Sequence, residues 1–322
     1  MRILVTGGAG YIGSQVCKVL ARAGFEPVAY DNLTRGSAAA VRWGPLEIGD
    51  LTDGARLRDV LRRHRPRGVM HFAALASVAE SVARPDLYYH NNVRGSLTLF
   101  DALSELGIGI VIYSSSCATY GLPVSLPIGE DHPQNPINPY GTTKLMVERI
   151  LKDYGTAYGV KYIIFRYFNA AGADPDCEVG ESHDPETHAV PLAVMAAIGR
   201  GPPFRVFGSD YPTPDGSAIR DYIHVLDLAE AHVGALKHLL AGGASEVFNL
   251  GTSHGTSVLQ MVAAVERVGG RRVPVVHCAR RSGDPPILTA DTQRARTTLG
   301  WQPKLSEIDQ IVRTAWAWHN TR

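Results

Sequence analysis

The residues best placed to carry out chemistry are Tyr140 and Lys144, which lie four positions apart in the stretch 138–144. Asn138 is a suitable N-cap and Pro139 a suitable first helical residue, so the stretch predicts the start of a helix. Residues i and i+4 share one helix face, so the lysine ammonium can lie beside the phenol or share a ligand with it. Fixed positive charges in a water-poor cleft can lower a phenol's pKa from about 10 to about 7, which requires roughly 4 kcal/mol of differential stabilisation. The pair is therefore a candidate general base.

Taken alone, this pair is a weak signal. By chance, about one chain in four with this number of tyrosines and lysines contains a Tyr-x-x-x-Lys pair. Tyr140 could be a half-buried packing residue and Lys144 a solvated residue on a helix. The weight of the pair depends on the rest of the chain.

A glycine-rich turn follows the first predicted strand, Ile3-Leu4-Val5, and leads into a helix that should end near Gly24. Gly7, Gly10 and Gly13 would permit a tight turn, a close approach of the backbone to a pyrophosphate, and tight packing of the helix. The phosphates would lie at the N-terminus of that helix, where backbone N–H groups can bind them. The turn therefore predicts a dinucleotide site.

An acidic residue follows the next predicted strand, Pro27-Val28-Ala29-Tyr30. The carboxylate of Asp31 can bind both hydroxyl groups of an adenosine ribose and would repel a 2′-phosphate. The order of strand, glycines, helix, strand and aspartate thus predicts NAD rather than NADP. Arg35 is close enough in the sequence to leave NADP open.

Further strands are predicted at residues 69–72, 110–113 and 162–165, separated by helical stretches such as 88–106 and 140–154. This alternation predicts an α/β fold with a doubly wound parallel sheet of the Rossmann type. In such sheets, ligands bind beyond the carboxyl ends of the strands. The residues that follow strands, and should converge on one cleft, are Gly7, Asp31, Phe72-Ala73-Ala74, Ser114-Ser115-Ser116 and Phe168-Asn169.

The composition is that of an ordinary globular protein. At 322 residues, with 45% hydrophobic and 20% charged residues, the chain is long enough for two domains or one large domain. A formal net charge of +1 supplies no global field for nucleic acid or an anionic membrane, so neither is expected as a partner. Any anionic ligand must be held by a few placed groups.

The four cysteines have neither Cys-x-x-Cys spacing nor the density of a secreted disulfide scaffold. No metal site is predicted, and a reducing cytoplasm fits best. The first residues lack the pattern of a signal peptide, and no apolar run approaches the roughly 18 residues of a membrane span. A cytoplasmic protein is therefore expected.

A series of short segments, in order and at near-family spacing, resembles the UDP-glucose 4-epimerases of the extended short-chain dehydrogenase/reductase family. The resemblance covers nearly the whole chain. The segments are Thr6–Gly13, Asp31-Asn32, Gly49-Asp50-Leu51, Phe72–Leu75, Asn91-Asn92-Val93, Ser114–Ser116, Tyr140-x-x-x-Lys144, Arg166–Asn169 and Asp221–Val225.

The resemblance implies a role for each site residue. Tyr140 would be the acid/base, Lys144 would bind the nicotinamide ribose and lower the pKa of the tyrosine, and Ser116 would hydrogen-bond the 4-oxygen of the sugar. The positions that would hold NAD are Gly7, Gly10, Tyr11, Ile12, Gly13, Asp31, Asn32, Asp50, Leu51, Phe72, Ala73, Ala74, Asn91, Ser114, Tyr140, Lys144 and Phe168. The positions that would hold the UDP-sugar are Ser116, Tyr140, Asn169, Phe207, Arg220, Arg281, Asp284 and Leu288.

The implied reaction interconverts UDP-glucose and UDP-galactose through a 4-keto sugar. Hydride leaves C4 for NAD and returns on the opposite face, while Tyr140 removes the proton from the 4-hydroxyl. The resemblance also implies a homodimer and two domains. We expect an NAD-binding Rossmann domain at 1–172 and a smaller C-terminal substrate-binding domain at 173–322, with part of about 216–250 returning to the first.

The chain departs from the family pattern at two positions. Ala76 stands where the family often has a lysine that reaches the cofactor, so one NAD contact could be missing. Leu288 stands where the family frequently has a bulky Tyr or a small Cys that gates the sugar pocket. The range of sugars is therefore open.

Other functions remain to be weighed. A 4-epimerase of another UDP-sugar (a pentose, uronic acid or N-acetylhexosamine) is the closest competitor. A dehydratase or decarboxylase of the same family usually carries a carboxylate just after the serine, whereas Ser116 is followed by Cys117-Ala118-Thr119-Tyr120. A non-catalytic NAD-sensing protein is also compatible with the fold, but the presence of Ser116, Tyr140 and Lys144 argues against it.

Overall fold

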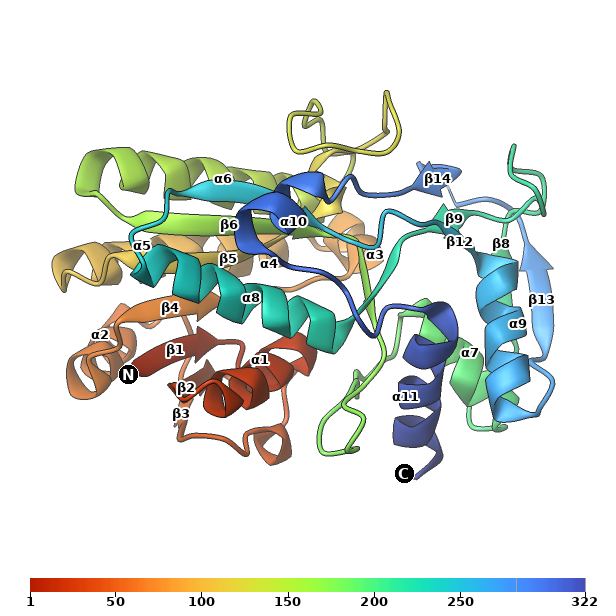
Figure 1. Ribbon diagram of the computed structural model, residues 1–322, viewed down its shortest axis with the longest axis horizontal. Coiled ribbons are helices and arrows are strands. Elements are labelled where there is room, and N and C mark those ends of the chain that lie inside the picture. The colour runs from red at the N-terminus through yellow and green to blue at the C-terminus, as the bar shows by residue number, and fades with distance from the viewer. Residues whose placement is uncertain (282, 322) are drawn as a thin grey trace. The chain divides into compact units, whose positions relative to one another are not determined.

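The structure is a computed structural model that describes residues 1–281 and 283–321 (Figure 1). Its chain divides into two compact units. Unit 1 comprises Met1–Gly121, Pro133–Tyr167 and Ala229–Phe248, and unit 2 comprises Leu122–His132, Phe168–Leu228 and Asn249–Arg322. The predicted division placed NAD binding in residues 1–172 and substrate binding in 173–322, with part of about 216–250 returning to the first domain. The assignment of cofactor binding to unit 1 and of substrate binding to unit 2 remains a proposal.

A seven-stranded sheet forms the centre of unit 1 in the described part of the chain, with the strand order β11-β6-β5-β4-β1-β2-β3. The pairings from β3 through β6 are parallel, which confirms the predicted doubly wound α/β fold. The strands are β1 (Arg2–Thr6), β2 (Glu26–Asp31), β3 (Leu46–Ile48), β4 (Gly68–His71), β5 (Ile110–Ser116), β6 (Lys161–Tyr167) and β11 (Glu246–Leu250).

The order of the strands reverses between β1 and β4. From β1 the chain moves outward through β2 to β3, and then returns to place β4 on the other side of β1. In a parallel sheet, such a reversal opens a crevice at the carboxyl ends of the two strands, where ligands bind. Because Gly7 follows β1 and Phe72 follows β4, both begin the loops at this crevice.

Helices cover both faces of this sheet (Figure 1). On one face, α2 (Gly54–His64), α5 (Gly95–Glu105) and α6 (Pro139–Tyr158) share a buried apolar core with the strands. On the other face lie α1 (Tyr11–Arg22) and the unit 1 part of α8 (Val225–Leu240). The strands are therefore buried on both sides, as expected for continuous apolar runs such as Ile3-Leu4-Val5.

Helix α6 begins as predicted but ends later. The Asn138 side chain accepts a hydrogen bond from the Gly141 amide at 2.8 Å, so it is the N-cap. The helix continues past Gly155 to Gly159, which ends it in the left-handed conformation at φ 71°. A Cβ atom on Gly155 would lie 2.7 Å from the ring of Tyr162, so this glycine permits close packing and does not mark the helix end.

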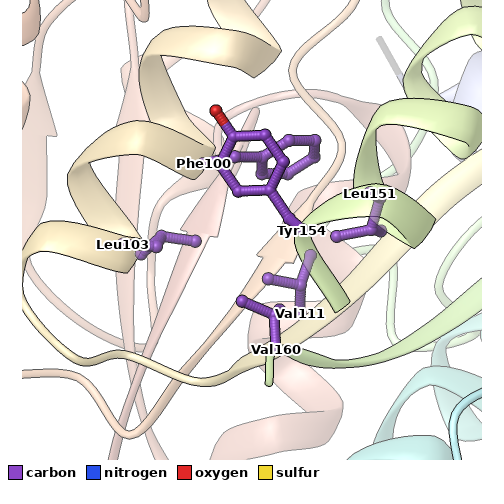
Figure 2. Close-up of a pocket in the computed structure, with 6 residues that line it drawn as sticks. All are labelled: Phe100, Leu103, Val111, Leu151, Tyr154 and Val160. Atoms are coloured by element: carbon purple, nitrogen blue, oxygen red, sulfur yellow. The ribbon is translucent and has the colours of Figure 1, made fainter. Parts of the chain in front are cut away.

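Six side chains from the α5, α6 and β5 region surround a small apolar gap in the core of unit 1 (Figure 2). The hydroxyl group of Tyr154 points away from the gap and donates to the Asp101 carboxylate. The gap has no polar lining and no room for a water molecule, so it is a seam in the core and not a ligand site. The six residues are Phe100, Leu103, Val111, Leu151, Tyr154 and Val160.

Unit 2 is built on three packed helices, α7 (Ala189–Ala197), α9 (Val258–Gly269) and α11 (Ile308–Asn320), which share an apolar core. Short strands form small sheets beside them. These strands are β7 (Asn169–Ala171), β8 (Phe204–Phe207), β9 (Ile219–Arg220), β10 (Tyr222–His224), β12 (Thr256–Ser257), β13 (Val275–Cys278) and β14 (Ile287–Leu288).

The shorter α-helices are α3 (Val78–Ala83), α4 (Pro85–Tyr88) and α10 (Gln293–Leu299). Short 3-10 helices lie at Ala38–Ala40 and Cys117–Thr119, and a π-helical turn lies at Tyr89–Arg94. Within residues 1–281 and 283–321, none of the helices combines the length and apolar character that a membrane crossing requires.

Candidate active site

The glycine turn after β1 has the tight geometry that its spacing predicts. Gly7 has φ +71°, and a Cβ atom there would lie 2.7 Å from the Ala73 amide nitrogen. A Cβ atom on Gly13 would lie 2.1 Å from the Gly7 carbonyl oxygen, so only glycine lets α1 pack against the turn. Gly10 is the N-cap of α1 and has no side chain that could bind the first amides of the helix. The first turn of α1 also contains no acidic residue. The amides that open α1 can therefore receive an anion.

Asp31 ties the end of β2 to the glycine turn. Its carboxylate accepts hydrogen bonds from the amides of Ala9 at 3.0 Å and Leu33 at 2.8 Å. Each carboxylate oxygen has two lone pairs, so the group can still accept from ribose hydroxyls. Arg35, which left NADP open, pairs with Glu80 at 2.8 Å.

Asp50 and Asn32 form a second polar group beside this strand end. The Asn32 side chain donates to Asp50 Oδ2 at 2.7 Å, and the Thr52 amide and hydroxyl donate to Asp50 Oδ1 at 2.8 and 2.7 Å. Burial raises the pKa of Asp50, but these hydrogen bonds outweigh it and leave the pKa below its usual value. Asp50 is therefore held as a carboxylate. The adjacent Leu51 is buried.

The three predicted catalytic residues come together at the carboxyl end of β5. Lys144 lies on α6 and donates from Nζ to the Ser114 carbonyl oxygen at 2.7 Å. Its ammonium lies 5.9 Å from the centre of the Tyr140 ring and 5.1 Å from that of Tyr113. The Ser116 side chain lies close enough to Tyr140 to oppose the rise in the pKa of its phenol. The predicted sharing of one helix face by Tyr140 and Lys144 is thus observed.

The pKa values of this pair are set by burial. Burial raises the pKa of Tyr140 to about 12, although the hydrogen bond with Ser116 opposes it. Burial also lowers the pKa of Lys144 to about 7, although the charge of Glu148 opposes it. In the chain by itself, the Tyr140 pKa therefore moves in the direction opposite to the expectation that Lys144 lowers it. The physical reason is that a dry site favours the neutral form of each group.

A buried ion pair between Glu148 and Arg166 supports α6. Sequence reasoning did not single out Glu148. Glu148 is one helical turn beyond Lys144, and Arg166 binds it at 2.7 Å. Ser115 also donates to Glu148, at 2.5 Å, which links α6 to β5 between Ser114 and Ser116. The signal in the sequence is a glutamate at a position where the helix pattern requires burial.

His71 is a second missed residue. Its Nδ1 lies 2.7 Å from Thr6 Oγ1 and its Nε2 lies 2.9 Å from Ser96 Oγ, so it bridges the ends of β1 and β4 to α5. Burial lowers its pKa to about 3, and the charge of Lys144 lowers it further in the same direction. The ring is therefore neutral. A histidine within an apolar strand was the available signal.

Asparagines 91 and 92 lie where the predicted helix 88–106 is interrupted. A π-helical turn, Tyr89–Arg94, separates α4 from α5. The buried Asn92 side chain donates to the Leu75 carbonyl at 3.0 Å and to Thr143 Oγ1 at 3.1 Å, and Asn91 donates to Asn92 Oδ1 at 2.9 Å. The turn thus holds the loop after β4 against α6.

The remaining predicted cofactor residues lie at separate positions, all but one of them in unit 1. Tyr11 and Ile12 are half-buried at the start of α1, and Ala73 and Ala74 are half-buried in the loop after β4. The Phe72 ring packs 4.8 Å from the ring of His232. Phe168 is buried in unit 2, where its amide donates to the Leu250 carbonyl at 3.2 Å.

The predicted substrate residues of unit 2 form two small groups. The Arg220 guanidinium donates to the Asp284 carboxylate, and Leu288 is paired with Arg220 across β14 and β9. The Arg281 guanidinium lies 3.8 Å above the centre of the Phe207 ring. Asn169 is apart from both groups on β7, with an exposed side chain and its amide bonded to the Asp221 carbonyl at 2.9 Å.

Asp221 is the residue of this region that sequence reasoning left unassigned. Its buried carboxylate accepts from the Thr252 amide and hydroxyl, each at 2.7 Å, and from the amides of Ser253 and Ala290, each at 3.1 Å. These bonds fix the loop beside Arg220. Burial raises the Asp221 pKa, and the hydrogen bonds oppose that shift without cancelling it.

Comparison with known proteins places the chain in a family. Residues 3–251 match the NAD dependent epimerase/dehydratase family. The chain is 53% identical over 320 residues to a UDP-glucose 4-epimerase of Rhizobium meliloti (strain 1021), covering 99% of this chain and 97% of that protein.

Two solved structures have the same fold over the whole chain. The crystal structure of a UDP-glucose 4-epimerase from Brucella ovis in complex with NAD is 54% identical, with a TM-score of 0.97 over 98% of this chain and 97% of that one. The enzyme from Bifidobacterium longum, in complex with NAD⁺ and UDP, is 35% identical, with a TM-score of 0.95 over 100% and 98% of the two chains.

The buried neutral His71 predicts a pH-dependent stability. Because its folded pKa lies below its unfolded value of about 6.5, the unfolded chain binds more protons as the pH falls below 6.5. Stability is therefore lost on acidification, by up to about 1.4 kcal/mol per pH unit from this one group. We expect His71→Asn to show a shallower loss between pH 7 and 5 in urea denaturation, whereas the exposed His277→Asn keeps the wild-type slope. Equal slopes for wild type and His71→Asn would contradict this assignment.

Proposed function

Because the chain belongs to the NAD dependent epimerase/dehydratase family, we propose that it interconverts UDP-glucose and UDP-galactose, with NAD as its cofactor. The observation that carries this proposal is the grouping of Ser116, Tyr140 and Lys144 at the end of β5. The relatives named UDP-glucose 4-epimerase match over nearly the full length of the chain, which supports the same activity here.

The residues of unit 1 fit NAD. The glycine turn is a cradle that a Cβ atom at Gly7 or Gly13 would fill, and it opens onto the N-terminus of α1, where a pyrophosphate binds well. Asp31 would hold the adenosine ribose. Lys144 would hold the nicotinamide ribose, and Asn91 is placed in the adjoining loop network. The exposed Ala76 contributes no such contact.

We propose further cofactor contacts from residues that lie beside these strand ends. The side chains or backbones of these residues would complete the site. They are Gly10, Tyr11, Ile12, Asn32, Asp50, Leu51, Phe72, Ala73, Ala74, Ser114 and Phe168.

Tyr140 moves the proton in the reaction. Its phenolate takes the proton of the sugar's 4-hydroxyl, while Ser116 holds the 4-oxygen, and the product of this step is a 4-keto sugar. When bound, NAD would supply the acceptor for the C4 hydride and a positive charge that favours the phenolate. Burial of Tyr140 makes that charge necessary, since the chain alone holds the pKa of this phenol near 12.

Unit 2 carries the groups that suit a uridine diphosphate. Planar guanidinium groups pair well with phosphate oxygens, so Arg220 and Arg281 would bind the diphosphate. Phe207 would stack on the uracil, with Asn169 and Asp284 as further polar contacts. The bond between Asp284 and Arg220 already aims one guanidinium, which reduces the freedom it loses on binding.

One alternative function stays open, and the others are disfavoured. The half-buried Leu288, in register with Arg220, leaves open another UDP-sugar: a pentose, a uronic acid or an N-acetylhexosamine. A dehydratase or decarboxylase is disfavoured because Cys117-Ala118-Thr119 follows Ser116 with no acid among them. A purely NAD-sensing role is disfavoured because the catalytic groups are assembled.

We also propose that the chain forms a homodimer in the cytoplasm. The exposed apolar side chain of Met146 on α6 would be covered in such an interface. None of the four cysteines forms a disulfide bond, which suits a reducing compartment.

Replacing Tyr140 by Phe tests the proposed function. The change removes the base but leaves the cofactor site, so epimerisation should fall by at least roughly 10²–10⁴-fold while NAD still copurifies. Tyr158→Phe, which changes an exposed tyrosine on the same helix, should retain normal turnover.

Lys144→Ala should lower both turnover and NAD content. Near-normal turnover of UDP-galactose by Tyr140→Phe would overturn the assignment, and recovery of NADP from denatured protein would contradict the role of Asp31.

Replacing Leu288 by Ser tests the sugar range. An N-acetyl group at C2 needs room when the keto sugar turns over, so Leu288 should restrict UDP-N-acetylgalactosamine more than UDP-galactose. We expect Leu288→Ser to raise the ratio of kcat/KM for these two substrates. Ile287→Ser, whose side chain points to the other face of the strand, is the matched control. An unchanged ratio would show that Leu288 is not the gate.

A further inference from the structure

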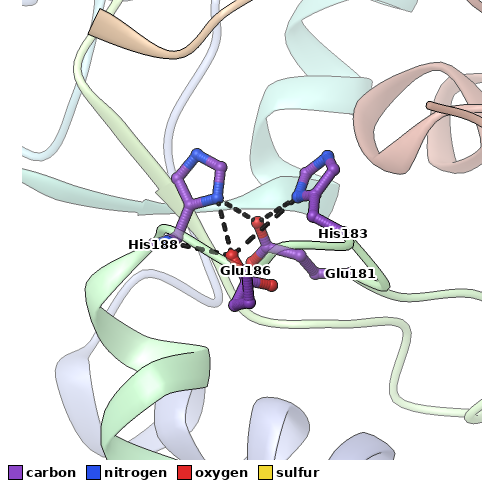
Figure 3. A group of neighbouring side chains, drawn as sticks. All are labelled: Glu181, His183, Glu186 and His188. Carbon is purple, nitrogen blue, oxygen red and sulfur yellow. Dashed lines mark hydrogen bonds and ion pairs between the residues drawn. The ribbon is translucent and has the colours of Figure 1, made fainter. Parts of the chain in front are cut away.

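A cluster of two histidines and two glutamates lies outside the site described above, in unit 2. It is formed by Glu181, His183, Glu186 and His188, within one short segment that ends at the start of α7 (Figure 3). Nothing in the proposed epimerisation uses these residues. The spacing of the cysteines gave no sign of a metal site, and this segment contains no cysteine.

The potential ligand atoms of the cluster face one another. His188 Nδ1 lies 2.5 Å from Glu181 Oε1 and 3.1 Å from Glu186 Oε1, and His183 Nδ1 lies 3.0 Å from Glu181 Oε1. One ligand atom from each of the four residues lies within 4.8 Å of the others. Both imidazoles present the same ring nitrogen, Nδ1, to the carboxylates (Figure 3).

A second observation is the environment of Glu181. Its side chain is 2% exposed, yet its Oε2 atom is buried with no hydrogen-bond partner. An ionised carboxylate oxygen left unpaired in a dry environment is costly, and native structures usually satisfy such atoms with a partner or an ion. Because Oε1 of the same carboxylate lies among the histidine nitrogens, a bound cation would also lie within reach of Oε2.

The charge of the cluster matches a divalent ion. Glu181 and Glu186 bring two negative charges, and the Glu186 side chain is only 7% exposed. Two neutral imidazoles and two carboxylates are a common ligand set for zinc and neighbouring transition metals, whereas calcium and magnesium prefer oxygen alone. Around a tetrahedral zinc ion with bonds of about 2.0–2.1 Å, ligand atoms lie about 3.3 Å apart. The nitrogen–oxygen distances within the cluster range from 2.5 to 4.0 Å, so each of these pairs needs to change by less than about 1 Å.

The surrounding structure holds the segment in place. The Glu181 carbonyl accepts from Trp318 Nε1 on α11 at 2.7 Å, and a Cβ atom on Gly180 would lie 2.5 Å from the Trp318 ring. Glu186 Oε1 accepts from the amides of Thr187 at 2.7 Å and His188 at 2.9 Å, which orients that carboxylate. His188 is also the N-cap residue of α7. An ion here would fasten the segment between α11 and α7.

We propose that Glu181, His183, Glu186 and His188 bind one divalent transition-metal ion, with zinc the best match, and that the ion stabilises unit 2. The site is structural, because none of its residues belongs to the proposed cofactor or substrate groups. Without a metal, burial opposes a charged His188, but the two carboxylates outweigh it and raise its pKa to about 10. Metal binding must displace that proton.

The test uses the purified full-length protein after treatment with EDTA and dialysis. Zinc chloride is added, unbound metal is removed by gel filtration, and zinc per chain is measured by elemental analysis. We expect one zinc per chain and a higher melting temperature in the presence of zinc. Cobalt(II) should give the visible absorption of a tetrahedral site. Failure to retain stoichiometric zinc would overturn the proposal.

Variants locate the ion. Glu181→Gln, His183→Gln and Glu186→Gln should each weaken zinc binding by more than the roughly 10–100-fold typical of losing an outer-shell partner. His254→Gln, an exposed histidine elsewhere in unit 2, should bind as the wild type does. Asp176→Asn removes a carboxylate from a neighbouring acidic turn and should also have no effect. Since the His183 side chain is 28% exposed, its variant keeps the test valid if Glu181→Gln fails to fold.

The possible outcomes separate the explanations. Zinc retained equally by wild type and all cluster variants would show adventitious binding elsewhere and overturn the proposal. Zinc lost only in Asp176→Asn would place the ion in the acidic turn and also overturn it. Epimerase activity is not a readout here, so failure of this proposal and failure of the proposed function remain distinguishable.

Discussion

The hydrogen bond from the Lys144 ammonium to the Ser114 carbonyl is the interaction on which the rest of the site depends. It joins α6 to the carboxyl end of β5 at 2.7 Å, inside the protein. With the lysine fixed there, Tyr140 on the same helix face meets Ser116 at the end of the same strand. The Glu148–Arg166 ion pair, one turn further along α6, holds the helix in this register.

Burial gives this arrangement its chemical character. It favours a neutral phenol at Tyr140 and lowers the pKa of Lys144 to about 7, so both groups lie far from their values in water. Such perturbed groups are typical of functional sites. In the proposed mechanism, proton transfer by Tyr140 therefore depends on a positive charge that arrives with the cofactor. This dependence couples the readiness of the base to the oxidation state of NAD, because only the oxidised nicotinamide is cationic.

The sequence predicted those features whose causes are local. Gly7 and Gly13 were found from their spacing because a tight turn and a close helix contact exclude a side chain. Asn138 and Pro139 marked the start of α6 for the same kind of reason. The doubly wound sheet followed from the alternation of apolar strands with helices.

Features that depend on distant partners were not predictable in this way. The neutrality of His71 arises from burial in the folded chain and from the charge of Lys144, which is far from it in the sequence. The predicted helix 140–154 stops before Gly155, whereas the structure continues through this glycine because it packs against the ring of Tyr162. The elevated pKa of Tyr140 arises from burial, which a helix pattern does not report. In unit 2 the substrate residues come from several short strands and loops, so their grouping could be reached only by resemblance.

The most direct test of this account is a spectroscopic titration of Tyr140 in the two oxidation states of the bound cofactor. Phenolate absorption would be followed against pH in the wild-type holoenzyme and in Tyr140→Phe, first with NAD⁺ and then after chemical reduction to NADH. The account predicts a difference signal that titrates near pH 7 with NAD⁺ and moves to distinctly higher pH with NADH. The same titration in both states, or no phenolate near neutral pH with NAD⁺, would contradict it.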